Sequence, residues 1–415
     1  MSTRDAAAAR DAADPLAPFR DRFVLDPAGP VYMDGNSLGR LPRSTVETVA
    51  RVVTEEWGGE LVAAWEHWID LQQRVGAVVA GLIGAPPGSV TIADSTTVNL
   101  YKLATAAASA FPNRRVILTD SDNFPTDRYA LEGVARALGK ELRVLDVDPV
   151  DGITAARLAE AVDDDVALVS FSLVAYRSGA LADMAAINDV ARSAGAMTLW
   201  DLSHAVGSVP IDLTGTGADL AVGCTYKYLN GGPGAPAFLY VRSALQGALH
   251  QPIWGWFAHE DQFAFDAEFR PARGIERYLV GTPPILSTAA ALPGIAMVAE
   301  AGIEAIRRKS IAATEYLVDR YDDVLAPLGV DLGSPRDPQR RGSHIALEHP
   351  EGLGISRWLR TAGGVVVDFR SPSTIRVAVA PLYTTYTDIW DAVEAIRSAV
   401  NGRRWESAPD DTVVT

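Results

Sequence analysis

The stretch VALVSFSLVAYRSGALADMAAINDVARSAGAMTLWD, residues 166–201, decides the fold. It contains an apolar run at 166–173, a stretch with helical periodicity at 184–195 and a second apolar run at 197–201. Short strands that alternate with helices of about ten residues are typical of βαβ units. Near-continuous apolar runs such as Val166–Val169 fit strands that are buried on both faces. The stretch therefore predicts a mainly parallel sheet with helices on both sides.

The same alternation extends outward from this stretch, from Val116 to Val241. The pattern changes after about Pro283, where a long helical segment at 303–325 precedes strands at 344–348, 365–369 and 375–380. This second pattern indicates a smaller α+β domain. We therefore expect three parts: an N-terminal arm at 1–45 that packs on the small domain, a large α/β domain at 46–285 and a small C-terminal α+β domain at 286–415.

Composition excludes several classes of partner. The 415 residues include 37 basic and 52 acidic side chains, so the net charge is 37 − 52 = −15. No stretch is rich in Lys or Arg, so the surface footprint needed for nucleic acid or an anionic membrane is absent from the sequence. No apolar run approaches the ~20 residues that span a bilayer. The one cysteine, Cys224, is typical of a reducing compartment, and we expect a cytoplasmic protein.

Two polar motifs follow neighbouring apolar strands. WDLSH at 200–204 places Asp201 at the end of one strand, and TYKYLN at 225–230 places Lys227 after the next. Open α/β sheets bind their ligands at this edge. A lysine that can form a Schiff base and a carboxylate that can keep a pyridine nitrogen protonated are the groups that pyridoxal phosphate chemistry requires. The alternative interpretation is a buried Asp–Lys ion pair.

Two further segments fit a cofactor with a phosphate and a flat ring. DSTTVN at 94–99 opens a helix, where backbone N–H groups and hydroxyls can bind a phosphate. FPTD at 124–127 can present the face of Phe124 to a ring. Each segment also has an ordinary interpretation, the first as a Ser/Thr helix cap and the second as a plain loop.

These motifs and their order resemble the kynureninases, pyridoxal phosphate enzymes with the fold of aspartate aminotransferase. The resemblance extends over nearly the whole chain and implies a type I fold, in which a mainly parallel sheet of seven strands is flanked by helices and joined to a smaller α+β domain. The motifs that carry it are YMDGNSLG (32–39), FPTD (124–127), AYRSG (175–179), Asp201 with His204, TYKYLN (225–230), GWFAH (255–259), GTPPI (281–285), IRVA (375–378) and PLY (381–383).

The resemblance also implies the roles of particular residues toward the cofactor. Lys227 would form the Schiff base and later move the Cα proton, while Asp201 would pair with the pyridine nitrogen and Phe124 would stack on the ring. Trp256 and Thr282 would reach the phosphate in the neighbouring subunit, which implies a homodimer with a shared active site. The implied cofactor-binding residues are Thr96, Thr97, Phe124, Asp127, Ser172, Asp201, His204, Tyr226, Lys227, Trp256 and Thr282.

The implied reaction is hydrolytic cleavage of the Cβ–Cγ bond of L-kynurenine to anthranilate and L-alanine, or of 3-hydroxy-L-kynurenine to the hydroxylated product. Arg376 would grip the substrate carboxylate as a bidentate fork, which a lysine does less well. The Gly281-Thr282 pair is similar to bacterial enzymes that favour kynurenine. Tyr226 is equally suited to a proton relay and to phosphate binding. A modified kynurenine or another β-substituted amino acid is the alternative substrate.

The remaining substrate contacts come from a region that aligns less clearly. Ser37, Trp65 and His67 fall where relatives contact the substrate ring. For His67, a packing or surface role on a helix is an equal alternative.

Other enzyme classes fit less well. Gly35-Asn36-Ser37-Leu38-Gly39 matches the G-x-S-x-G elbow of serine hydrolases, but it lies ahead of the strand and helix alternation in which that elbow occurs. A cysteine desulfurase needs a mobile cysteine, whereas Cys224 lies on an apolar strand. A binding protein without activity would not need Lys227, Asp201 and Arg376 together. The six histidines and one cysteine show no zinc-type spacing, so no metal site is expected.

Overall fold

The computed structural model describes residues 3–265 and 267–408. Its principal sheet has seven strands in the spatial order β2-β8-β7-β6-β5-β3-β4. Each neighbouring pair from β7 to β4 is parallel, whereas β8 runs antiparallel to both of its neighbours. The prediction of a mainly parallel seven-stranded sheet is therefore confirmed. The strands are β2 (Val90–Ile92), β3 (Val116–Asp120), β4 (Glu141–Leu145), β5 (Val166–Ser172), β6 (Met197–Asp201), β7 (Leu220–Gly223) and β8 (Phe238–Val241).

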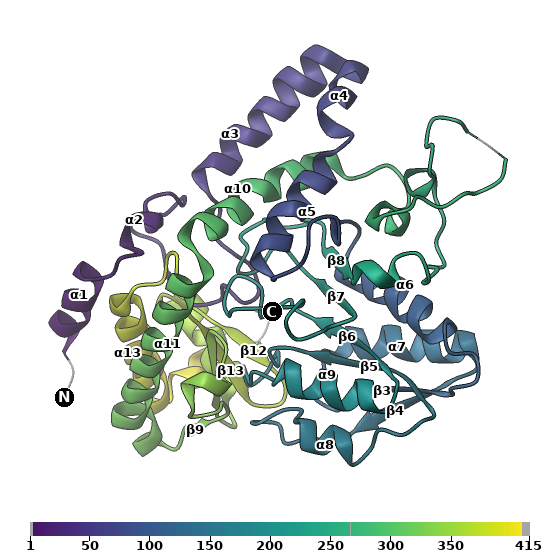
Figure 1. Cartoon of the computed structure of the whole chain (residues 1–415). Coiled ribbons are helices and arrows are strands. Elements are labelled where there is room, and N and C mark those ends of the chain that lie inside the picture. The colour runs from purple at the N-terminus through teal and green to yellow at the C-terminus, as the bar shows by residue number, and fades with distance from the viewer. Residues whose placement is uncertain (1–2, 266, 409–415) are drawn as a thin grey trace.

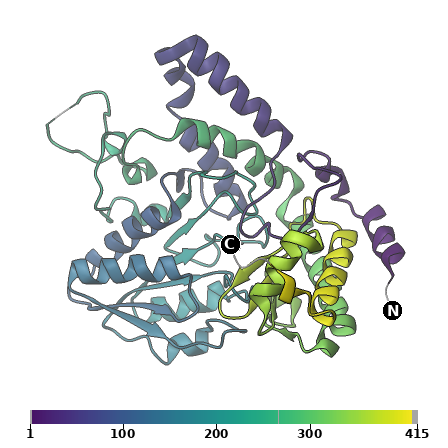
Figure 2. The ribbon, with the colours of Figure 1, turned by 180° about the vertical axis from the view of Figure 1, so that it is seen from behind.

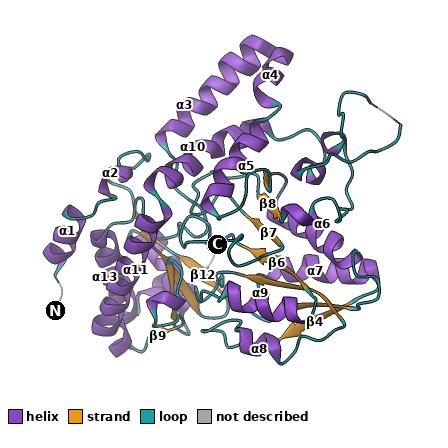
Figure 3. Cartoon of the chain, viewed as in Figure 1, coloured by secondary structure: helices purple, strands orange, loops and turns teal. Residues whose placement is uncertain are grey.

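Helices cover both faces of this sheet. Successive side chains of a strand point to opposite faces, so a strand with apolar residues on both faces needs cover on both. On β6, Leu199 packs into a core cluster with residues of α6 and α7, whereas Trp200 packs into the cluster that contains residues of α9. Figure 3 shows the strands lying between these helices. The flanking helices are α6 (Thr96–Ser109), α7 (Pro125–Leu138), α8 (Ala155–Ala159) and α9 (Met184–Ser193).

The carboxyl ends of the central strands meet at one edge of the sheet. Ser172 and Asp201 are register partners at the ends of β5 and β6. Asp201 is also the register partner of Val222 on β7, and Lys227 follows the last residue of β7 by four positions. Strand register therefore brings Asp201 and Lys227 to the same edge, where ligands bind in open α/β sheets.

Helix α7 begins at Pro125, directly after Phe124. Pro125 occupies the first turn, where its fixed φ fits the helix and its missing N–H has no partner to lose. Phe124 is therefore the N-cap residue, and Asp127 lies in the first turn. The helix ends at Gly139, which adopts the left-handed conformation. The proline thus places both Phe124 and Asp127 at the edge that carries Asp201.

A second sheet of four antiparallel strands has the order β12-β13-β10-β9 and a separate core cluster. The strand predicted at 365–369 is wrong as a single unit. Its first part, β11, pairs in parallel with β1, and its second part, β12, pairs with β13. The elements of this region are β1 (Val31–Tyr32), β9 (Asp331–Leu332), β10 (His344–Glu348), β11 (Val365–Val366), β12 (Asp368–Arg370), β13 (Thr374–Ala378), α11 (Ile303–Arg320), α12 (Gly352–Trp358) and α13 (Tyr386–Asn401).

The N-terminal segments pack in two places (Figures 1 and 2). Helix α1 lies against α13, where Arg4 forms a bidentate ion pair with Asp391 at 2.8 Å. Helix α3 packs on α10 and projects from the body in both views, continued by the π-helical segment η1. The bounds are α1 (Arg4–Ala12), α2 (Ala17–Arg20), α3 (Arg43–Arg51), η1 (Val52–Glu60), η2 (Leu61–Ala64), α4 (Trp65–Trp68), α5 (Leu71–Leu82), η4 (Trp256–Ala258), η5 (Ile275–Tyr278) and α10 (Ile285–Ala301).

Helix length and the grouping of side chains in residues 3–265 and 267–408 bear on membrane insertion and metal binding. No single helix is long and apolar enough to cross a membrane, and only α10 with the helical stretch to Leu328, bent by 82° relative to each other, passes by length and composition. Within the same residues, no group of three or more His, Cys, Asp or Glu side chains could hold a metal ion.

Candidate active site

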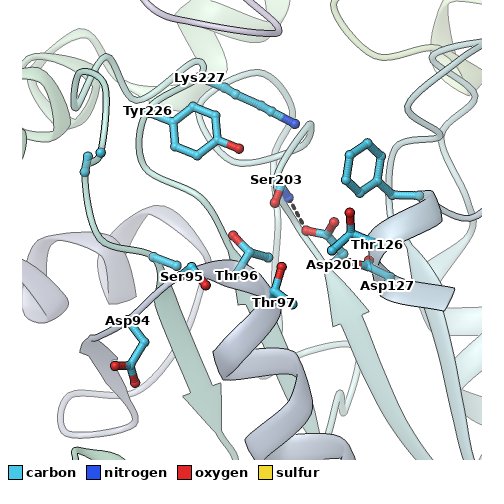
Figure 4. A pocket seen from close by; sticks show the side chains of 14 residues that line it. Asp94, Ser95, Thr96, Thr97, Thr126, Asp127, Asp201, Ser203, Tyr226 and Lys227 are labelled. Atoms are coloured by element: carbon cyan, nitrogen blue, oxygen red, sulfur yellow. Dashed lines mark hydrogen bonds between the residues drawn. The ribbon is translucent and has the colours of Figure 1, made fainter. Parts of the chain in front are cut away.

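A cavity of about 520 Å³ lies at the carboxyl edge of the seven-stranded sheet. In Figure 4, Lys227 extends over it from one side, Thr97 rises from α6 below, and Asp201 lies across from both. Half of its lining was expected from the sequence, and these seven residues are Thr96, Thr97, Phe124, Asp127, Asp201, Tyr226 and Lys227. The other lining residues are Asp94, Ser95, Thr126, Ser203, Gly234, Ala235 and Ala237.

Lys227 is the amine of the cavity. Its Nζ lies 3.0 Å from Nε2 of His204. Burial lowers the pKa of Lys227, which favours the neutral, nucleophilic form. Burial and the positive charge of Lys227 hold the pKa of His204 well below its usual range. His204 is therefore a neutral partner that fixes the position of the lysine without adding charge.

Two carboxyl groups lie together at the opposite side of the cavity. The Oδ1 atom of Asp201 accepts the Ser203 N–H at 2.7 Å, which orients the carboxylate. Asp127 is buried, and its Oδ2 atom has no hydrogen-bond partner. Burial and the Asp201 carboxylate beside it hold the pKa of Asp127 well above its usual range. The pair is therefore suited to a single cationic nitrogen.

The start of α6 supplies donors to the cavity floor. The Ser95 hydroxyl caps the helix by accepting the Val98 N–H at 3.3 Å. The first amides of a helix have no partner within it, so those of Thr96 and Thr97 remain for an anion. Both hydroxyls point into the cavity in Figure 4. This end of the cavity suits a phosphate.

Aromatic rings bound the space between the lysine and the carboxyl groups. The Phe124 ring centroid is 5.8 Å from Lys227 Nζ, and Tyr176 packs edge-on against Phe124. The Tyr226 ring centroid is 5.9 Å from the same nitrogen. The neighbouring Cys224 sulfur and burial raise the pKa of Tyr226, so its hydroxyl stays protonated at neutral pH. A flat ring fits beside Phe124, with a hydroxyl donor opposite.

Other predicted residues lie outside this cavity. Ser172 donates to Oδ1 of Asn123 at 2.8 Å, and both residues line a different, smaller pocket. Trp65 and Trp256 pack into a small apolar cluster with Ala93, next to the cavity rim. Thr282 is exposed. The chain alone therefore does not bring Trp256 or Thr282 to its own cavity.

His67 lies in a different place altogether. Its Nε2 atom is 2.9 Å from Glu60 Oε2, and its side chain is 56% exposed. It lines a separate cavity of about 340 Å³ beside α3. Within this chain, the geometry supports the surface alternative for His67.

Arg376 and Ser37 form a second polar cluster together with Asp368. Arg376 is 1% exposed and forms an ion pair with Asp368, its register partner on the adjacent strand β12. Its Nη2 atom also donates to Ser37 Oγ at 3.2 Å, and its Nη1 atom donates to the Tyr176 carbonyl at 2.5 Å. The Nε–H of Arg376 is buried without a partner. The Nε–H donor of the guanidinium thus remains for another acceptor.

The structure also bears on the alternative enzyme classes. Ser37 lies in a turn after the two-residue strand β1, and its hydroxyl donates to Asp368 rather than meeting a histidine. Gly39, the last glycine of the G-x-S-x-G match, packs closely on the Lys227 carbonyl oxygen. A Cβ atom at position 39 would lie 2.4 Å from that oxygen. Cys224 is buried, and burial raises the pKa of its thiol. Neither the serine nor the cysteine is placed as a nucleophile.

Sequence reasoning missed three polar residues that the structure brings to these clusters. Ser203 orients Asp201, Asp368 holds Arg376, and Lys102 pairs with Asp94 on the cavity lining. A signal for Lys102 was present, because it falls among apolar residues on the buried face of α6. No local signal pointed to Asp368, because its contact depends on strand pairing.

Comparison with known proteins agrees with this geometry. The family model described as the kynureninase C-terminal domain matches residues 306–396. A kynureninase from Pseudomonas fluorescens is 42% identical over 416 residues, which cover 98% of each chain. The chain belongs to the kynureninase family. A kynureninase from Burkholderia pseudomallei is similarly 43% identical over 415 residues, with 98% of each chain covered.

Solved structures show the fold of this family member. A cysteine desulfurase from Thermococcus onnurineus superposes with a TM-score of 0.78 at 18% identity, over 90% of this chain and 95% of that chain. The lyase C-DES, solved with glycine linked to its PLP cofactor, gives a TM-score of 0.79 at 20% identity over 89% and 97% of the two chains. Identities this low establish the type I fold alone. They do not extend the desulfurase or lyase activity to the present chain.

Proposed function

We propose that this kynureninase-family chain hydrolyses the Cβ–Cγ bond of L-kynurenine, with water supplying the hydroxyl of the anthranilate carboxyl group and L-alanine as the second product. The observation that carries the proposal is the placement of Lys227, with neutral His204 behind it, across the cavity from the Asp127 and Asp201 pair. Family membership at 42% identity over 98% of the chain supports the substrate class.

The residues of the cavity fit pyridoxal phosphate. Lys227 would hold the aldehyde carbon, the Asp201 and Asp127 pair would hold the pyridine nitrogen, and the start of α6 would hold the phosphate. The unpartnered Oδ2 atom of buried Asp127 is the observation that tests this fit, because a buried oxygen of this kind needs a hydrogen-bond partner. When bound, the cofactor supplies a ring that accepts the electron pair left at the substrate Cα.

Side chains of the protein accept and donate the protons that move in the reaction. Lys227 Nζ is the base for the Cα proton, because burial lowers its pKa and favours the neutral amine. The Tyr226 hydroxyl is the donor for the proton that completes the methyl group of alanine, because Tyr226 lines the cavity with its ring centroid 5.9 Å from Lys227 Nζ. Tyr226 also lies within reach of the phosphate end, and we assign it both tasks.

Arg376 would bind the substrate carboxylate with the donors that Asp368 and Ser37 leave unused. Because Asp368 already neutralises part of the arginine charge, a substrate carboxylate shares the guanidinium with a resident anion. Tight fixation of the arginine favours one orientation of the amino acid over others.

We further propose a homodimer in which Trp256 and Thr282 complete the partner's site. An exposed apolar surface formed by Trp57, Pro284 and Leu286 lies close to Thr282, and a groove of about 450 Å³ lies within it. Apolar surfaces of this kind mark association sites. A second copy of this chain is the occupant that also explains why Thr282 does not reach its own cavity. A cytoplasmic location, supported by the single buried thiol, belongs to the same proposal.

The proposal is tested by mixing the holoprotein with L-kynurenine and 3-hydroxy-L-kynurenine in separate reactions. Anthranilate, its hydroxylated analogue and alanine are quantified, with Lys227→Ala as the inactive control. We expect faster turnover of L-kynurenine and none in the variant. Cofactor binding without turnover of either compound would contradict the substrate claim.

The shared site is tested by complementation between two inactive variants. Lys227→Ala and Trp256→Ala chains are mixed, denatured and refolded together. Statistical pairing of a shared-site dimer restores one intact site in half of the dimers, about a quarter of the wild-type activity. A mixture that stays inactive would contradict the shared site.

A further inference from the structure

Lys102 is a buried cation that the proposed reaction does not use. It lies on α6 with its side chain fully buried, and its Nζ atom is 2.6 Å from Asp94 Oδ2 and 2.7 Å from the Tyr278 carbonyl oxygen. A cation buried this completely persists only where such partners compensate the lost hydration. The ammonium therefore ties the cavity lining at Asp94 to the segment that ends η5.

Asp94 has an unusual backbone conformation. Its φ is +47°, in the left-handed region that residues other than glycine rarely adopt, although Asp and Asn tolerate it best. The Asp94 carbonyl accepts the Ala237 N–H at 2.9 Å, and the Ala93 N–H donates to the Ala237 carbonyl at 2.8 Å. This turn lies immediately before Ser95, the N-cap of α6, so its conformation sets where the helix begins.

The Asp94 carboxylate is directed toward Lys102 rather than toward the centre of the cavity. Figure 4 shows its side chain pointing away from the Thr96 and Thr97 hydroxyls. The ion pair thus contacts the turn on the side that faces away from the cavity, while Thr96 and Thr97 face the cavity. Strained backbone of this kind persists only where surrounding contacts hold it.

We propose that Lys102 is a positioning residue for the cofactor phosphate, which holds Asp94 in its left-handed conformation and so presents the start of α6 to the cavity. The proposal rests on the proposed binding of the phosphate at Thr96 and Thr97. Lys102 differs from Lys227 in that it does not touch the cofactor. Its effect reaches the phosphate only through the shape of the turn.

The proposal predicts that glycine at position 94 makes Lys102 dispensable for phosphate binding. In Lys102→Met the ion pair is lost, and the left-handed turn is no longer held. Adding Asp94→Gly removes the conformational cost, because glycine adopts positive φ freely. Adding Asp94→Ala removes the same carboxylate but keeps the cost, so it separates conformation from charge.

The experiment compares the equilibrium binding of pyridoxal phosphate and of pyridoxal, which lacks the phosphate, by absorbance titration of the apoprotein. The chains tested are wild type, Lys102→Met, Lys102→Met/Asp94→Gly and Lys102→Met/Asp94→Ala. The matched control is Lys309→Met, because Lys309 is a similarly buried lysine, 2.6 Å from Asp14, outside the cavity lining. Thermal unfolding of each chain verifies that it is folded.

We expect Lys102→Met to weaken pyridoxal phosphate binding by about tenfold or more while pyridoxal binding changes little. The Asp94→Gly double variant should regain wild-type preference for the phosphate form, and the Asp94→Ala double variant should not. Equal rescue by alanine and glycine, or a preference for phosphate that Lys102→Met keeps, overturns the role of Lys102. A wild-type chain that binds both compounds equally overturns the phosphate placement itself, whatever Lys102 does.

Discussion

The ion pair at the proposed phosphate site, Lys102–Asp94, and the ion pair at the proposed substrate site, Arg376–Asp368, differ in the hydrogen-bond donors that they leave free. On the phosphate side, Lys102 is fully buried, its partner Asp94 is 30% exposed, and the ammonium is taken up by Asp94 and a carbonyl. On the substrate side, Arg376 and Asp368 are 1% and 0% exposed, yet the arginine keeps an unpartnered N–H. Lys102 thus has a structural role, whereas Arg376 keeps an N–H donor that can bind a ligand.

A buried charge can therefore be structural in one place and functional in another. A compact ammonium with its main contacts satisfied stabilises the backbone to which it is tied. A planar guanidinium has five donors, so it can be held by a resident carboxylate and still bind a second one. We therefore expect changes on the two sides to separate cofactor binding from substrate binding.

The largest effect is expected on the substrate side. In Arg376→Lys the charge remains but the fork of donors is lost, so kcat/KM for L-kynurenine should fall by about a hundredfold or more. Affinity for pyridoxal phosphate should stay within about threefold of wild type, because Arg376 lies outside the cavity lining. Steady-state kinetics and cofactor titration check both values. Equal loss of cofactor and substrate binding would show that the two sides do not act separately.

A smaller effect is expected from the two carboxyl groups of the cofactor side. Asp201→Asn removes the negative charge of the pair, and cofactor affinity should fall by about tenfold to a hundredfold. Asp127→Asn should lower it less than Asp201→Asn does, because burial and Asp201 hold the pKa of Asp127 well above its usual range. Absorbance titrations of both variants compare them directly. A larger loss in Asp127→Asn than in Asp201→Asn would reverse the assignment of the charge.

The smallest effect concerns the pH dependence of stability on the substrate side. Burial first, and then the Asp368 carboxylate, raise the pKa of Asp34 to about 7. A carboxyl group whose folded-state pKa lies above its unfolded value of 3.8 stabilises the fold at low pH, and this contribution is lost as the pH rises from about 4 to about 7.

In Asp34→Asn this pH-dependent contribution disappears. The variant should therefore gain about 1–2 kcal/mol in unfolding free energy relative to wild type between pH 5 and pH 8. Denaturant unfolding at the two pH values measures the difference. A difference between variant and wild type that is the same at both pH values would show that Asp34 does not titrate in this range.

Much of the fold could be predicted because its signals are local. The alternation of short apolar runs and helical segments at 116–241 predicts where the strands end. Asp201 lies at one strand end, and Lys227 lies four residues after another. The predicted boundaries at 45 and 285 stay a prediction. Helix α10 was not predicted, because Pro293 lies inside it and apolar residues are spread around it rather than along one face.

The substrate side could not be predicted from spacing. Asp368 meets Arg376 only because β12 and β13 pair in one register, and β11 leaves that sheet to pair with β1. The positions of Trp256, Thr282 and His67 were taken from family resemblance, and a single chain does not bring them to the cavity. Their roles stay predictions, and the complementation experiment addresses the role of Trp256.

The most direct test of the central claim is to find which lysine carries the cofactor. The chain has four lysines, Lys102, Lys140, Lys227 and Lys309. The holoprotein is reduced with borohydride, digested and mapped by mass spectrometry. We expect a pyridoxyl group on Lys227 and none on Lys102. A pyridoxyl group on Lys102, or on no lysine, would contradict it.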